Sequence, residues 1–133
     1  MEQQSVILVY SSCNILLSII PTFYLFGFFS SLLLFSLFIT SCNYHLFNKY
    51  KKLDMILAIS NWIYFFYFFK YNVSKYFLYF GFIQYIISQF VHLIKPYHFL
   101  SYFFHKNLHN FAYLSIWVEF FLHLEQNSHK NIE

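Results

Sequence analysis

The strongest constraint on the fold is a series of long apolar blocks separated by short polar joints. The block at residues 23–43 runs for about 21 residues, enough for a helix to cross the ~30 Å hydrocarbon core of a bilayer. Charged residues make up 10% of the chain, against about 25% in a typical soluble domain. Backbone polar groups in hydrocarbon must be bonded within their own segment, which favours helices. The sequence therefore predicts an all-α, polytopic membrane helix bundle.

The apolar blocks predict about five transmembrane helices in one domain covering residues 1–133. Pro21 is expected to close the first helix, and the polar tail EQNSHKNIE is expected to be frayed. The predicted spans are residues 6–20, 23–43, 53–69, 76–94 and 104–124.

Alternation of five spans places the second-to-third and fourth-to-fifth connections on the same side as the N-terminus. Five lysines fall on that side and three on the other, which predicts a cytoplasmic N-terminus. We expect an integral, multi-pass membrane protein whose partners are membrane lipid and, in a homo- or hetero-oligomer, other membrane chains. The eight lysines form no basic stripe, so nucleic acid is not an expected partner. Cys13 and Cys42 lie far apart in sequence and are expected to be buried free thiols.

Five polar residues are expected to meet at one end of this bundle. Ser41 and His45 are four residues apart at the end of the second predicted helix, and Asp54 begins the third. His105 and His109 are again four apart, at the start of the fifth, so that both imidazoles lie on one helix face. The alternating topology places these three helix ends at the same membrane surface.

The residue types in this group are those of a catalytic zinc site. Three neutral imidazoles, from His45, His105 and His109, leave a fourth tetrahedral position on Zn²⁺ for water. Asp54 can take a proton from that water or orient it, and the Ser41 hydroxyl can donate to an oxyanion. Ionisable residues at membrane depth are costly, which favours a functional interpretation.

The order S-x3-H, then D, then H-x3-H resembles the CREST superfamily, which includes alkaline ceramidases, progestin and adipoQ receptors and myomaker-like proteins. The resemblance implies a zinc ion on His45, His105 and His109, with Ser41 and Asp54 beside it. It also implies hydrolysis of a lipid amide or ester bond, in the endoplasmic reticulum or Golgi. Members of that family have seven helices, so a pair between the third and the last would be absent from this chain.

Other interpretations stay open at this stage. His45 and the His105–His109 pair can be interfacial residues at wet helix ends, and Asp54 can be an acidic helix-start residue. Glu119 and His123, also four apart, can form a polar pair at the far end of the last span. The AT-rich bias of the composition favours a non-catalytic subunit of a larger, possibly organellar, membrane complex. A receptor-like protein with a structural zinc is a third hypothesis.

Overall fold

The computed structural model describes residues 2–96 and 98–132, with side chains from Ser5 onward, and confirms the all-α prediction. The described residues form six helices and no strand. The helices are α1 (Glu2–Leu17), α2 (Ile19–Phe26), α3 (Phe28–Phe47), α4 (Lys51–Phe68), α5 (Asn72–Ile94) and α6 (Phe99–Lys130).

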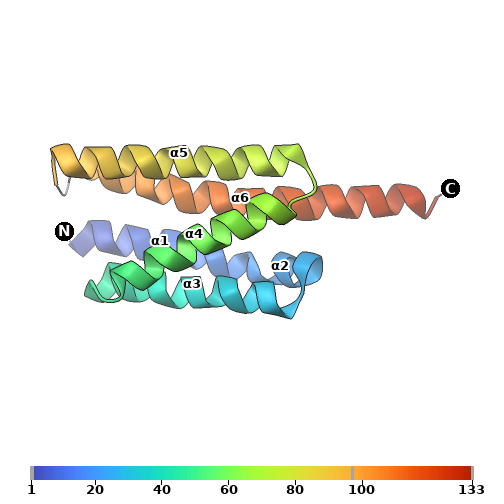
Figure 1. Cartoon of the computed structure of the whole chain (residues 1–133), viewed down its shortest axis with the longest axis horizontal. Coiled ribbons are helices and arrows are strands. Elements are labelled where there is room, and N and C mark those ends of the chain that lie inside the picture. Colours follow the sequence, from blue (N-terminus) through green and yellow to red (C-terminus); the bar gives the residue numbers. More distant parts are fainter. Residues whose placement is uncertain (1, 97, 133) are drawn as a thin grey trace.

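The helices form a bundle in which α1, α3, α5 and α6 run along the long axis and α4 crosses them obliquely (Figure 1). One end of the bundle holds the N-terminus, the end of α3, the start of α4, the end of α5 and the start of α6 (Figure 1). The predicted meeting of these helix ends is therefore found. The C-terminal part of α6 extends beyond the opposite end of the bundle (Figure 1).

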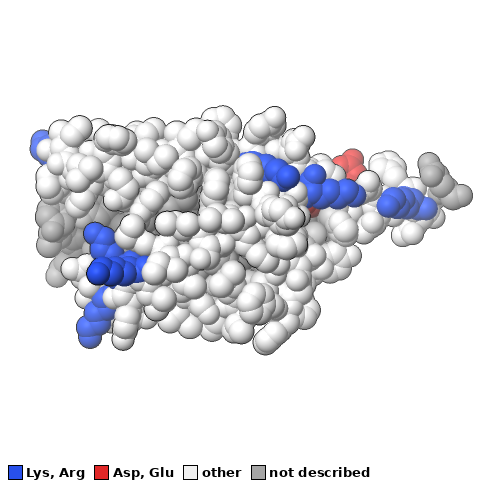
Figure 2. Space-filling view, viewed as in Figure 1, with Lys and Arg blue, Asp and Glu red and all other residues white. Residues whose placement is uncertain are grey.

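Three segments are long and apolar enough to cross a membrane, namely Ser5–Phe26, Phe28–Phe47 and Asn72–Ile94. The first is formed by α1 and α2 together. Figure 2 shows the lysines gathered toward the two ends of this face, with an uncharged band between them. Such a distribution suits a protein whose middle lies in hydrocarbon. That α4 and α6 also cross, which would make five spans, stays a prediction.

The boundaries of the first two helices differ from those expected, although Pro21 accounts for the end of the first. α1 ends at Leu17, four residues before Pro21, because proline has no N–H to donate to the Leu17 carbonyl; Pro21 itself lies in the first turn of α2. The chain then turns at Gly27, whose φ of 88° is a conformation that side-chain-bearing residues rarely adopt. The prediction of a frayed tail is wrong, since α6 continues to Lys130.

Close packing of α5 against α6 sets the register of the last helix. Small residues recur every seven positions on α5, at Ser74, Gly81 and Ser88, and all three are buried. A Cβ at Gly81 would lie 3.0 Å from Phe111 Cβ, so glycine lets the backbones approach. The Ser88 hydroxyl donates to the carbonyl of Ser101, and the Ser101 hydroxyl donates back to that of Ser88.

The interior is apolar in the middle of the bundle and polar at both ends. The central core consists of Ile15, Leu34, Phe65, Phe69, Leu78 and Ile116. At the end away from the N-terminus, the buried Glu119 carboxylate accepts the backbone N–H groups of Lys70 and Tyr71, just before α5 begins. Glu119 is thus bonded to the connection between α4 and α5, while His123 is bonded to Asn127. The open interpretation of Glu119 and His123 as a polar pair is replaced by these separate contacts.

Candidate metal centre

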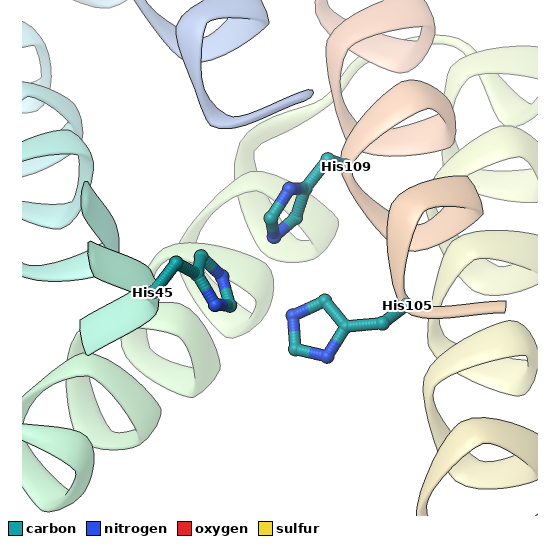
Figure 3. Close-up of side chains that lie close together, drawn as sticks. All are labelled: His45, His105 and His109. Carbon is teal, nitrogen blue, oxygen red and sulfur yellow. The ribbon is translucent and has the colours of Figure 1, made fainter. Parts of the chain in front are cut away.

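Three histidines gather at the N-terminal end of the bundle, as their spacing predicts. Figure 3 shows the rings of His105 and His109, carried by α6, facing the ring of His45 on α3. Their ring centroids are 5.0–5.8 Å apart. One ligand atom from each ring lies within 4.8 Å of the other two, and such atoms fall within about 2.8 Å of a common point. Zinc–nitrogen bonds are ~2.0–2.1 Å long, so shifts of less than about 1 Å would complete the coordination.

Local helix geometry explains how the rings come together. His105 and His109 are one turn apart, so α6 presents both on one face. His45 lies in the last turn of α3, which ends at Asn48 in the left-handed conformation (φ 53°). Tyr50 is also left-handed (φ 62°), and the two residues reverse the chain into α4 within a short loop. This tight reversal keeps Asp54 close to the end of α3.

Burial separates these residues from ordinary interfacial polar groups. The exposed fractions of His45 and His109 are 8% each, and that of Asp54 is 7%. Asp54 lies in the first turn of α4, as the helix-start interpretation expects, and both Asp54 and His45 are buried within the bundle. His105 is half-buried.

The hydrogen bonding of His45 indicates whether a metal ion fits this group of histidines. Its Nε2 atom is buried and has no hydrogen-bond partner among the residues that the structure describes. A buried polar atom without a partner costs about 1–3 kcal/mol, so such an atom calls for an explanation. A lone pair offered to a cation, beside two further imidazoles, is an arrangement that suits zinc. The donor set and the unpaired atom therefore both fit a metal ligand.

Ser41 and Asp54 line the same cavity as the three histidines. The Thr40 hydroxyl lies 3.4 Å from the Asp54 carboxylate, and the carbonyls of Leu37 and Ser36, at 3.0 and 3.1 Å, compete for its one proton. Ser41 is 2% exposed, and its Oγ lies 3.1 Å from Ser12 Oγ on α1. The structure thus brings all five predicted residues to one cavity, with the imidazoles alone forming the group of candidate metal ligands.

Two residues of α1 that sequence reasoning missed complete the site. Ser11 Oγ lies 2.8 Å from His109 Nδ1, and Ser12 contacts Ser41. Serines bonded to a carbonyl of the preceding turn are common in membrane helices, so the pattern SSC carries no signal of a role at the site.

The cavity has a volume of about 460 Å³ and extends along the bundle. Near the N-terminal end its wall is polar, with Asn48, Lys51 and Gln89. Beyond the histidines it becomes mostly apolar, apart from the buried Asn61, and reaches Phe65 and Ile116 of the core. This volume lies in the range of small-molecule sites, ~300–1,000 Å³.

The site can be compared with known proteins only through its residues. No protein-family model, curated protein or solved structure matches this chain. The resemblance to the CREST superfamily therefore stays a prediction carried by Ser41, His45, Asp54, His105 and His109.

Proposed function

We propose that the protein is a membrane-embedded, zinc-dependent hydrolase that cleaves an amide or ester bond of a lipid. The observation that carries this proposal is the convergence of three imidazoles within 4.8 Å, on the wall of a cavity that also holds Asp54 and Ser41. The unpaired Nε2 of His45 supports the same conclusion.

His45, His105 and His109 would hold the zinc ion and leave its fourth position open. Zinc bound there supplies a Lewis acid and lowers the pKa of bound water toward ~7. Asp54, in the first turn of α4, is the candidate general base that accepts the proton of the attacking water.

The hydrogen-bond directions assign Ser41 a more specific role. Ser12 donates its hydroxyl proton to the carbonyl of Leu8 at 2.9 Å. When Ser12 donates to Leu8 in this way, it accepts at 3.1 Å from Ser41, and the Ser41 proton then points toward α1. The lone pairs of Ser41 are then available to a water molecule, which favours Ser41 as the partner of the water over a donor to the oxyanion.

The cavity is suited to one acyl chain. Phe65, at its apolar end, lies three turns beyond Asp54 on α4, or about 16 Å at ~1.5 Å per residue. One leaflet of a bilayer has a hydrocarbon depth of about half of ~30 Å. An acyl chain extending along the bundle would therefore have its carbonyl carbon at the histidines and its polar group near Asn48, Lys51 and Gln89.

Elemental analysis of the purified protein in detergent tests the metal. We expect one zinc per chain, lost in each of His45→Ala, His105→Ala and His109→Ala. His129→Ala, at an exposed position near the end of α6, is the matched control and should keep zinc. Folded wild-type protein without zinc after reconstitution would refute the proposal.

Hydrolysis is tested separately on zinc-loaded protein with ceramides, phospholipids and other acyl lipids. Zinc-dependent release of fatty acid, lost in the three histidine variants, is the expected result. Stoichiometric zinc without turnover on any acyl lipid would replace the hydrolase with a structural zinc site.

A further inference from the structure

A hydrogen bond from the first helix reaches the candidate metal centre. Ser11 Oγ lies 2.8 Å from His109 Nδ1 and 2.8 Å from the backbone oxygen of Leu8. We propose that Ser11 is a positioning residue that holds His109 in the tautomer protonated at Nδ1, with Nε2 free to bind the metal. This inference rests on the proposed function, since it concerns the same metal.

The proposed tautomer fixes the direction of both hydrogen bonds. A serine hydroxyl carries one proton, and in the proposed arrangement that proton goes to the oxygen of Leu8, which can only accept. Ser11 must then accept from His109, which requires a hydrogen on Nδ1. A neutral imidazole has one N–H, so Nε2 of His109 carries the lone pair.

The three-dimensional arrangement of the rings agrees with this assignment. One nitrogen of His109 faces the rings of His45 and His105, and the other lies on the opposite side of the ring (Figure 3). The nitrogen bonded to Ser11 is Nδ1, which leaves Nε2 for the cluster. Metal-ligating histidines generally donate their other ring N–H to a fixed acceptor, which sets both tautomer and ring orientation.

Helix α1 is held in the register that this role requires. One turn beyond Ser11, the side-chain amide of Asn14 donates to Oδ1 of Asn110 on α6 at 3.0 Å. Asn110 directly follows His109, so two successive hydrogen bonds align α1 with this turn of α6. On its other side α1 contacts α3 through Ser12 and Ser41. The acceptor for His109 is therefore supplied by a rigid helix.

The tautomer is measured first, on metal-free protein with ¹⁵N-labelled histidine in detergent micelles. The ¹⁵N shifts of the two ring nitrogens show which one is protonated, and His109→Gln identifies the signals of His109. We expect Nδ1–H in the wild type and in Ser11→Thr, whose hydroxyl can make the same bonds. In Ser11→Ala the Nε2–H form should appear. Ser31→Ala, which removes a buried hydroxyl bonded to Gly27 at the other end of α3, should leave the spectrum of His109 unchanged.

Zinc affinity is measured next by competition with a chelator of known affinity. Ser11→Ala should bind zinc about 10–100-fold more weakly than the wild type, the usual effect of losing such a partner. Ser11→Thr should restore most of the affinity, and Ser31→Ala should match the wild type. Weakening by Ser11→Ala without a change of tautomer would overturn the inference, because it would indicate a general packing defect.

Two outcomes separate this inference from the proposed function. Wild-type affinity in Ser11→Ala, or an Nε2–H tautomer in the wild type, would overturn the role of Ser11 and leave the zinc site intact. Failure of the wild type to bind zinc would overturn the proposed function, while the tautomer of the metal-free protein would still decide whether Ser11 orients His109.

Discussion

Replacement of His45 by leucine should reverse the order of stability of variant and wild type, depending on zinc. Without zinc, wild-type His45 keeps a buried Nε2 atom that has no hydrogen-bond partner within the described residues. Leucine has no such atom and fills much of the same space. A histidine that served the fold alone would instead be costly to replace at 8% exposure.

The size of the effect follows from two terms. Removing an unsatisfied buried polar atom is worth about 1–3 kcal/mol, so metal-free His45→Leu should be more stable than metal-free wild type by up to that amount. Zinc at a free concentration 1,000-fold above its dissociation constant stabilises the wild type by about 4 kcal/mol. His45→Leu retains two of the three imidazoles, so most of that gain should be lost. The wild type should then be the more stable of the two in zinc.

Equilibrium unfolding in mixed micelles, with and without a zinc chelator, measures both terms. His129→Leu is the control, because His129 is exposed and far along α6 from the histidine group. It should follow the wild type in both conditions. If metal-free His45→Leu is clearly less stable than metal-free wild type, or if zinc stabilises both equally, His45 is a structural residue and the argument for a metal ligand fails.

Three further predictions concern the packing and the chemistry. Gly81→Ala should lower the free energy of unfolding by up to about 2 kcal/mol, because overpacking costs ~1–3 kcal/mol and alanine regains ~1 kcal/mol of helix propensity. The same substitution should weaken zinc binding, because the added Cβ presses on the turn that carries His109. Unchanged unfolding and affinity would contradict this close approach. Glu119→Gln should cost about 1–3 kcal/mol in the same unfolding assay, because charge-assisted bonds to two backbone N–H groups are weakened. Asp54→Asn should keep zinc and lower the rate of lipid hydrolysis by about 10²–10⁴-fold, and a rate near that of the wild type would exclude Asp54 as the base.

The histidine group was predictable because it depends on two simple rules. Residues four apart share a helix face, which pairs His105 with His109. An even number of passages along the bundle, by α4 and α5, between the helix carrying His45 and the one carrying His105 returns the chain to the same end. Errors of several residues in the helix boundaries, such as the shift of the second helix from 23–43 to 28–47, do not disturb either rule.

The partners of these residues could not be predicted, because they depend on register between helices that are distant in sequence. Ser11 meets His109, and Ser12 meets Ser41, through the axial position of α1 against α6 and α3. Hydrophobicity does not fix that position when the helices are apolar all round. Glu119 is a similar case, since its contacts with Lys70 and Tyr71 require knowledge of where α5 begins against α6.

Zinc at the three histidines would link α3 directly to the hairpin of α5 and α6. Without zinc, the contacts that hold the helices together differ along the bundle. The hairpin of α5 and α6 is tightly packed through Gly81 and Ser88. In the apolar middle of the bundle, Phe65 of α4 and Ile116 of α6 belong to one core cluster. At the polar end, α3 is connected to α6 through α1, by Ser12–Ser41 on one side and Ser11–His109 on the other. A cation shared by His45 and the two histidines of α6 would add a direct link there. The mouth of the cavity would then be shaped by the metal, whereas its inner part is shaped by apolar packing and by the hydrogen bond from Trp62 to the Leu78 carbonyl.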